Sequence, residues 1–244
     1  AQAGSFGARK GSAGASWRTA AGTGFLLSAS RHMSDGDDLY YPEFDTPEQN
    51  NGISAGLDYE RGARLFASAA HGPFSFTAMN ARRVKGIPTA SFMQSFNDPR
   101  SRAMDRQTYL ALAYRAAAGA TEDVSARLVH GRYDTSGDYA VPDPGRTLGH
   151  TGSQARWYGA ELTLVSTRFN GHKIVAGIAA QRDYSLKQSL FSNNPAYPAY
   201  HHQTDGRRTG IYLQDEIAVG PDLLLNLGAR HDHSPGTHNS TSPR

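Results

Sequence analysis

The sequence has no cysteine, few lysines and no long apolar run. Without cysteine the chain has no disulfide bridges, thiolate metal sites or thiol catalysis. No apolar run reaches the roughly eighteen residues that a membrane-spanning helix requires. Only 4 of the 25 basic residues are lysines, and the 21 arginines are scattered with no run longer than two. The clustered basic patch typical of nucleic-acid binding is missing, so we expect no nucleic-acid partner.

The apolar content is low for a globular protein. Apolar residues make up 38% of the 244 residues, whereas ordinary domains reach about 45–50%. Aromatic residues still make up 10% of the chain, and its net charge is only +3, which is unlike the composition of a disordered chain. The sequence therefore predicts an ordered structure that needs little apolar core.

Apolar side chains recur at every second residue in many segments. Leu110, Leu112 and Tyr114 show the pattern, and Leu223, Leu225 and Leu227 repeat it. This period is typical of half-buried β-strands. We predict ten strands, at residues 5–19, 24–34, 53–71, 74–84, 106–116, 124–134, 153–168, 173–184, 207–218 and 222–233.

The links between these strands alternate between short and long. The long links, at 35–52, 85–105, 135–152 and 185–206, have 18 to 22 residues each. Compact soluble domains rarely contain such loops, and alternate long links must emerge from the same end of the sheet. Outer-membrane barrels have short periplasmic turns, long extracellular loops and strands that alternate apolar-out with polar-in. The pattern predicts an all-β, antiparallel, up-and-down transmembrane β-barrel.

Aromatic side chains are expected where such a barrel meets the lipid headgroups. The candidates for these girdles are Phe74, Phe76 and Phe169 beside short turns, and Tyr59, Tyr133 and Tyr184 toward the loops. The alternative is that tyrosine simply favours strands of any kind.

The last predicted hairpin carries a specific motif. Residues 210–216 read Gly-Ile-Tyr-Leu-Gln-Asp-Glu, Gly-Pro-Asp follows at 220–222, and alternating leucines lead to Gly-x-Arg-x-Asp at 228–232. This hairpin resembles a barrel hairpin of the TonB-dependent outer-membrane receptors. Segments of the first half are similar to the early barrel of the same family: 41–45, 50–52, 56–61, 85–89 and 96–100.

The resemblance implies a transport function. Such a receptor binds a scarce nutrient complex, for example a ferric siderophore, outside a Gram-negative cell and imports it through the outer membrane. Its barrel has 22 strands and is occluded by a plug domain, which couples it to the inner-membrane TonB energising complex. The expected partners are thus the plug, the TonB complex, the iron complex and outer-membrane lipid, and no enzymatic activity is expected.

The sequence also departs from the family pattern. We find no plug-like segment, no box for the energising partner and no terminal aromatic closing strand. We therefore expect residues 1–244 to be a single truncated domain with about ten strands of the larger barrel, which need not close on itself.

Two other functions remain open. The chain could instead be a small complete outer-membrane barrel or adhesin that binds through its loops, or an outer-membrane barrel hydrolase. Gly-x-Ser-x-Gly does not occur, and scattered Ser, His and Asp residues cannot be assembled into a triad from sequence alone. We accordingly name no catalytic residue.

Ligand-binding candidates fall into two groups. Strand alternation points the first group into the barrel: Arg127, Trp157, Glu161, Tyr212 and Gln214, together with Asp58, Arg64 and Glu216. The second group is expected in the loops: Tyr40, Tyr41, Phe44, Tyr197 and Tyr200, beside Arg100 and Arg182. Aromatic rings with arginines suit anionic iron complexes. The same residue types also suit the anionic outer leaflet.

Two clusters could hold metal ions. Asp35, Asp37 and Asp38 could bind calcium in the first long loop, and some members of the family use loop aspartates in this way. A solvated turn is the alternative interpretation. His201 and His202 could bind a transition metal or haem iron, although no third ligand follows at a suitable spacing. We expect no other cofactor.

Overall fold

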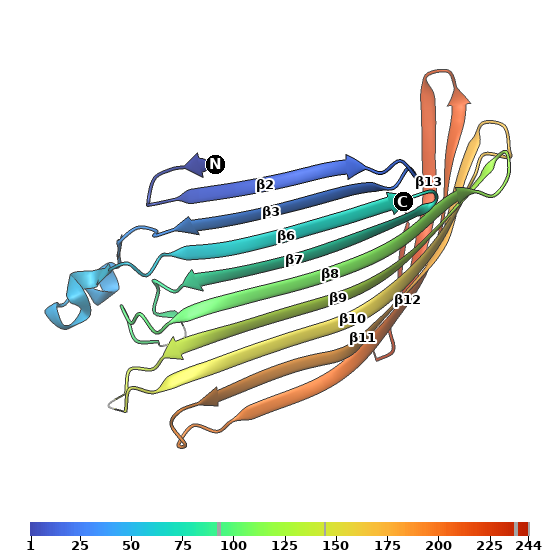
Figure 1. The fold of residues 1–244 in the computed structure, drawn as a ribbon. Coiled ribbons are helices and arrows are strands. Elements are labelled where there is room, and N and C mark those ends of the chain that lie inside the picture. The colour runs from blue at the N-terminus through green and yellow to red at the C-terminus, as the bar shows by residue number, and fades with distance from the viewer. Residues whose placement is uncertain (92–93, 144, 237–238, 244) are drawn as a thin grey trace.

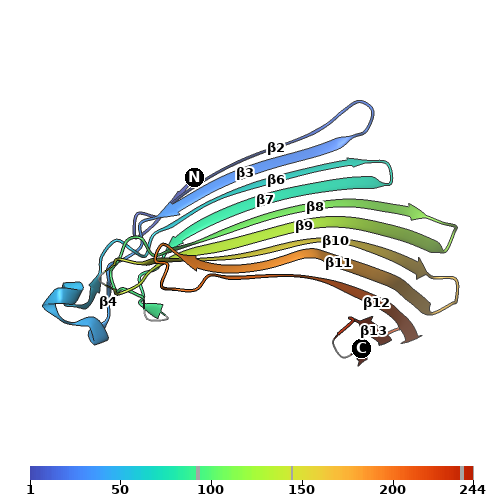
Figure 2. The same cartoon turned by 90° about the horizontal axis from the view of Figure 1, so that it is seen from below.

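A computed structural model describes residues 1–244 except 92–93, 144, 237–238 and 244. Twelve strands form one continuous antiparallel sheet, in which the neighbours in space are almost always neighbours in sequence (Figure 1). The order is β1-β2-β3-β6-β7-β8-β9-β10-β11-β12-β13-β14. The sheet is curved rather than flat (Figure 2). β1 and β14 form its two edges, so the sheet does not close.

The strands of this sheet lengthen steadily from β1 to β12 and are shorter again at β13 and β14. Their bounds are β1 (Gln2–Ala3), β2 (Arg9–Arg18), β3 (Gly24–Ser34), β6 (Glu60–His71), β7 (Phe74–Gly86), β8 (Arg102–Ala117), β9 (Glu122–Ala140), β10 (Leu148–Ser166), β11 (His172–Ser192), β12 (Tyr200–Gly220), β13 (Leu223–His233) and β14 (Ser240–Pro243). Between β3 and β6, β4 (Leu39–Tyr40) pairs with β5 (Ile53–Ser54) around the short 3-10 helices η1 (Pro42–Phe44) and η2 (Pro47–Gly52). No helix in the described segments is long and apolar enough to cross a membrane.

The ten predicted strands correspond to β2, β3 and β6 through β13, so the antiparallel up-and-down fold is confirmed. Short turns join the strands at one end of the sheet, and the longer links lie at the other end (Figure 1). Two of these turns have only two residues, at 72–73 and at 221–222; in the first, Gly72 has a positive φ of 52° and Pro73 follows.

The predicted lengths of two long loops are wrong. β9 continues to Ala140 and β10 begins at Leu148, so the third link has 7 residues rather than 18. β11 and β12 likewise extend into the fourth loop and leave only 193–199 between them. The extensions of β9 and β12 are mostly polar on both faces, so the period-two signal disappears there although the backbone ladder continues.

Two further boundaries differ from the prediction. Residues 53–71 are not one strand, because β5 belongs to the separate small sheet and β6 begins only at Glu60. Leu57, expected on the outer face of a strand, is instead 5% exposed between loops. The tail expected to be loop contains β14, which pairs with β13 through four residues.

The two faces of the sheet differ in chemistry. In antiparallel pairs, directly opposed residues point to the same face, so the register assigns every strand residue to a side. One face carries exposed apolar side chains in its turn-side half, including Leu27, Leu65, Leu112, Leu128, Leu162, Ile178, Ile211 and Leu225. A continuous apolar surface of this kind is expected to face an apolar environment. We call it the outer face.

The inner face is polar, and no apolar core lies beneath the sheet. Among the described residues, the only apolar side chains classed as buried are Leu57, Phe96 and Ala140, and all three lie at the loop end. Aromatic pairs also lie on the outer face, for example Phe74 with Tyr114 at 5.1 Å between ring centroids. Tyr133, predicted as a girdle residue, instead lies on the inner face, where it donates a hydrogen bond to Asp105.

Candidate functional site

The inner face gathers the interior candidates from β9, β10 and β12, with β11 between the last two. Arg127 on β9 lies directly opposite Glu161 on β10. Trp157 shares the face of Glu161 because the two residues are four apart in β10. Tyr212 and Gln214 on β12 join this face through their partners Gly177 and Val175 on β11. The inward orientation predicted for these five side chains therefore agrees with the register.

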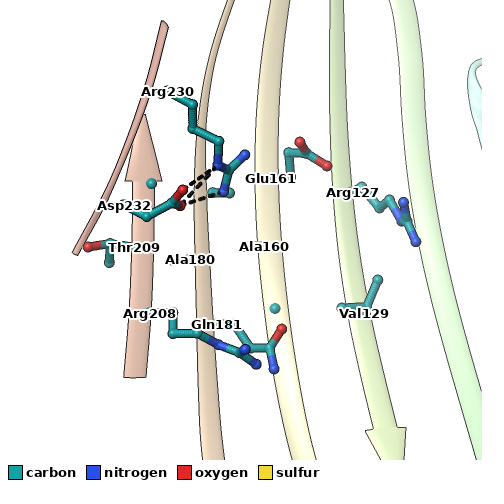
Figure 3. A pocket seen from close by; sticks show the side chains of 13 residues that line it. Arg127, Val129, Ala160, Glu161, Ala180, Gln181, Arg208, Thr209, Arg230 and Asp232 are labelled. Carbon is teal, nitrogen blue, oxygen red and sulfur yellow. Dashed lines mark hydrogen bonds and ion pairs between the residues drawn. The ribbon is translucent and has the colours of Figure 1, made fainter. Parts of the chain in front are cut away.

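Part of this face forms a shallow hollow across β9 to β13 (Figure 3). Its volume is about 420 Å³. Three arginines and two carboxylates line it: Arg127, Arg208, Arg230, Glu161 and Asp232. We call this part of the inner face the inner wall. Its composition suits contact with polar and anionic surfaces rather than apolar ones.

Tyr212 is the centre of a hydrogen-bond network in this wall. Its hydroxyl lies 2.7 Å from the Thr163 hydroxyl and donates to Glu161 Oε1 at 3.2 Å. The Arg230 guanidinium lies 5.7 Å from the centre of the Tyr212 ring, within the range of a cation–π contact. Three strands are thus joined by side chains as well as by their backbones.

Charged pairs fix the orientation of the remaining arginines. The Nε and Nη2 atoms of Arg230 both donate to the Asp232 carboxylate, the latter at 2.8 Å (Figure 3). Arg208 lies 3.4 Å from Asp183, which also accepts a hydrogen bond from Gln181 at 2.7 Å. Such networks hold charged side chains in place and still leave hydrogen-bond donors that a ligand on the inner side of the sheet could use.

Glycines make room for the large rings of the inner face. Trp157 lies directly opposite Gly131, and a Cβ on that glycine would overlap the indole ring. Tyr212 lies opposite Gly177 in the same way. Each ring therefore lies flat across a glycine of the next strand, which covers the exposed backbone and fixes the ring's position.

Arg127 and Gln214 make fewer contacts. Arg127 donates to the Tyr109 hydroxyl and lies 6.0 Å from the centre of that ring. Gln214 Nε2 donates to Asn226 at the long distance of 3.5 Å. Both side chains retain capacity to bind another surface.

Sequence reasoning missed several residues of this wall. Thr163, Gln181, Arg208 and Asp232 were not among the candidates, and neither was Arg230. Arg230 and Asp232 do belong to the Gly-x-Arg-x-Asp motif of the last hairpin, which was the available signal. Gln181 and Arg208 lie in predicted strands, where the same alternation points them inward, but the contact of Arg208 with Asp183 depends on the strand register, which the sequence does not fix.

A second cluster lies among the loops. Phe96 stacks on Phe44 with ring centroids 4.3 Å apart, and Tyr41 meets Phe96 edge-on at 5.7 Å. Phe96 is only 8% exposed. Two of the predicted loop aromatics thus pack around a third ring, which the sequence analysis did not single out. We call Tyr41, Phe44 and Phe96 the loop cluster.

Arg100 connects this region to the neighbouring loop. Its guanidinium donates twice to the Asp98 carboxylate, at 2.9 and 2.6 Å, and once to the carbonyl oxygen of Arg146 at 2.8 Å. The Arg100 guanidinium holds the pKa of the Asp98 carboxyl below its usual range. The loop therefore contains a preorganised arginine, but its charge is already shared with a carboxylate.

The remaining loop candidates are not brought together. Tyr40 donates to Asp45 and is 56% exposed, and Tyr197 is 46% exposed. Tyr200 opens β12, where its ring lies 6.4 Å from that of His202. Arg182 was expected in a loop, but it lies within β11 on the outer face and pairs with Asp205 at 3.0 Å.

The proposed metal ligands do not form a cluster. Within the described part of the chain, no group of three or more His, Cys, Asp or Glu side chains could hold a metal ion. Asp37 and Asp38 accept hydrogen bonds from the backbone, with Gly56 N donating to Asp38 Oδ1 at 2.7 Å. His201 and His202 are adjacent residues of β12 and point to opposite faces.

Comparison with known proteins identifies the fold. The profile of the family described as "TonB dependent receptor-like, beta-barrel" matches residues 70–244. The chain belongs to this family of receptor barrels. A search of curated protein sequences found no match.

Solved structures of receptors share the fold of this barrel segment. The ferric citrate transporter FecA superposes with a TM-score of 0.71 at 14% identity, over 98% of this chain and 38% of FecA. The ferric enterobactin receptor PfeA of Pseudomonas aeruginosa gives 0.66 at 13% identity, over 97% and 38%. Fiu, a ferric-catecholate import receptor of E. coli K12, gives 0.66 at 11% identity, over 99% and 49%. The chain thus spans about two fifths to one half of the length of these receptors.

Proposed function

We propose that this chain is part of the barrel of an outer-membrane receptor that imports a scarce nutrient complex, such as a ferric siderophore, with energy from the TonB complex. The observation that supports this proposal is the contrast between the two faces of the sheet: the inner wall is charged and hydrogen-bonded, and the outer face is apolar. The family to which the chain belongs supports it as well. Members of this family are transport receptors of the Gram-negative outer membrane. Residues 1–244 would form a single partial-barrel domain.

We assign the inner wall to contact with a plug domain. The inner wall presents hydrogen-bond donors and acceptors from Arg127, Glu161 and Tyr212. Neighbouring side chains already hold these three groups in place. A plug must be held firmly and still be able to move, which polar contacts that exchange with water allow better than an apolar interface. Trp157 and Gln214 extend the same surface.

We assign the loop end to the nutrient complex. The aromatic rings of the loop cluster, the exposed Tyr40, Tyr197 and Tyr200, and the guanidinium of Arg100 suit an anionic complex through stacking and charge. Support comes from the similar receptors, whose names give ferric enterobactin, ferric citrate and ferric catecholates as their ligands. A ferric complex with anionic oxygen ligands is therefore the class we expect.

Uptake by cells tests this function. The gene that encodes the chain is deleted, and uptake of radiolabelled ferric catecholate, ferric hydroxamate and ferric citrate is measured under iron limitation. We expect the loss of uptake of one complex, and the same loss when the energising system is inactivated. Arg100→Ala should raise the concentration for half-maximal uptake, whereas Arg168→Ala, in the turn at the opposite end, should not.

Two results would favour the other functions. Unchanged uptake of every complex, combined with loss of adhesion to surfaces, would favour a loop-binding barrel. Loss of a hydrolytic activity on replacing one loop Ser, His or Asp would favour an enzyme.

A further inference from the structure

The outer face carries three pairs of directly opposed arginines. Arg82 on β7 lies opposite Arg106 on β8, Arg132 on β9 opposite Arg156 on β10, and Arg182 on β11 opposite Arg207 on β12. We call these six residues the arginine belt. Each member lies an even number of residues from apolar residues of the outer face, such as Leu110 on β8 and Leu162 on β10, so its side chain starts on that face.

The belt is level. Arg132 lies ten residues after Glu122, the first residue of β9, and Arg182 lies ten after His172, the first of β11. Arg156 lies ten before Ser166, the end of β10. Ten residues span about 33 Å of strand, or about 25 Å along the membrane normal at a tilt of about 40°. That distance equals the height of the apolar band of an outer-membrane barrel, so the belt lies at its upper edge, on the loop side.

The belt has more positive charge than the protein neutralises. Like charges directly opposed on a sheet destabilise it. Arg132 pairs with Asp134 at 2.6 Å and Arg182 with Asp205 at 3.0 Å. In the described segments no carboxylate lies within ion-pair distance of the other four, Arg82, Arg106, Arg156 and Arg207.

Two of these four arginines have hydrogen-bond donors that lack a good acceptor. Arg82 donates only to the sulfur of Met104, at 3.4 Å, and a thioether is a weak acceptor. The remaining donors of the Arg82 guanidinium are therefore left for an acceptor from outside the chain. The Nε atom of Arg156 is buried without a hydrogen-bond partner, which adds to the cost of a charged group that no carboxylate neutralises.

We propose that the arginine belt binds the phosphate groups of the lipid in the outer leaflet. A phosphate between two opposed guanidiniums replaces their repulsion with charge-assisted hydrogen bonds, and the planar arginine fork suits its oxygens. The lipid acyl chains would then lie along the apolar band below. This inference rests on the proposed placement in the outer membrane, but it concerns a different surface from the site of nutrient uptake.

Native mass spectrometry of the complete receptor in detergent tests the proposal. The probes are lipid A with two phosphates and the same lipid with its phosphates removed. The variants are Arg82→Gln/Arg106→Gln, the charge-conserving Arg82→Lys/Arg106→Lys, and Arg168→Gln as the control in the opposite turn. Inorganic phosphate in excess distinguishes a lipid site from a site for free phosphate.

We expect phosphorylated lipid A to bind the unaltered receptor and the Arg168→Gln control equally. The glutamine double variant should bind it about tenfold more weakly, with the lysine variant between them. Lipid without phosphates should bind all four proteins alike, and inorganic phosphate should compete poorly. Equal binding of both lipids to the unaltered receptor, or unchanged binding by the glutamine variant, would overturn the proposal.

Two readouts separate this proposal from the proposed function. Uptake measured on the same variants should remain, because the belt lies away from the inner wall; absence of uptake in every protein would refute the transport function alone. If heat-modifiable mobility shows that a double variant does not fold, the comparison of the two lipids on the unaltered receptor still decides the proposal.

Discussion

The contact between Trp157 and Gly131 gives the sharpest test of the inner-wall register. Replacing Gly131 with alanine adds a single methyl group beneath the indole ring. That carbon would lie 2.7 Å from Cη2 of Trp157 and closer still to Cε2 and Cζ2. Carbon atoms pack at about 3.5–4.0 Å, so the ring must move by about 1 Å or leave its place over the glycine.

The expected cost follows from this overlap. Inserting a methyl group where no space exists destabilises a protein by about 1–3 kcal/mol. The three nearest heavy atoms to the added carbon all belong to the Trp157 side chain. Removing the ring by Trp157→Ala should therefore abolish the cost of the alanine at 131. We expect a coupling energy of about 1–3 kcal/mol between the two positions.

The measurement is a double-mutant cycle on the complete receptor in detergent, with urea unfolding followed by circular dichroism. Gly11→Ala is the matched control, because a Cβ at Gly11 on β2 would have no heavy atom within 4 Å. This control should raise the free energy of unfolding by up to about 1 kcal/mol, because alanine restricts the unfolded chain. A Gly131→Ala variant as stable as the control, or one whose cost persists without Trp157, would refute the register.

Three further predictions concern the network and the loops. Tyr212→Phe removes the hydroxyl between Thr163 and Glu161 and should lower the free energy of unfolding by about 1 kcal/mol; an unchanged urea midpoint would contradict it. Phe96→Ala should open the loop cluster, so that limited proteolysis cuts the loop between β7 and β8 faster. The urea midpoint of the barrel should stay within error. Equal cleavage of both proteins would contradict the packing. The pKa of Asp98 is held below its ordinary value of 3.8 mainly by Arg100, so their contact stabilises the fold fully above that pH and is lost as pH falls through the lowered pKa. The stability difference between the protein and Asp98→Asn should thus stay constant from pH 7 to 5 and shrink below about pH 4, whereas a difference that grows on acidification would contradict this sign.

The sequence predicted the strands wherever the two faces of the sheet differ in polarity. In β8 the apolar residues Leu110 and Leu112 alternate with small or polar ones because one side of the strand is apolar and the other is not. In the upper part of β9, Thr135 and Ser136 both meet polar surroundings, so no alternation marks the strand. The prediction therefore ended β9 and β11 too early.

The alternation over 53–59 was misleading for a different reason. In the packed loops at the end of the sheet, Leu57 and Ser54 are buried while Ile53 is 40% exposed, so apolar residues at every second position do not mark a strand here. Sequence alone could not separate these cases, because both produce the same period.

The inner-wall candidates were recovered only in part. Alternation within one strand points Glu161 and Tyr212 inward, but their contact depends on how β10, β11 and β12 are shifted against each other. That register also brings Arg208 to Asp183 and Trp157 to Gly131. Pairwise shifts of one residue would exchange the two faces, so these contacts needed the structure.

The most direct test of the whole account is the environment of neighbouring side chains on β10. This chain contains no cysteine. Once any cysteine outside it is replaced, Glu161→Cys, Leu162→Cys, Thr163→Cys and Leu164→Cys variants of the complete receptor can each carry one nitroxide label in lipid bilayers. Electron paramagnetic resonance then compares the accessibility of each label to oxygen and to a water-soluble nickel complex. We predict high oxygen accessibility at 162 and 164 and low oxygen accessibility at 161 and 163. Four labels with the same accessibility, or with the opposite alternation, would contradict a wall that separates lipid from a polar interior.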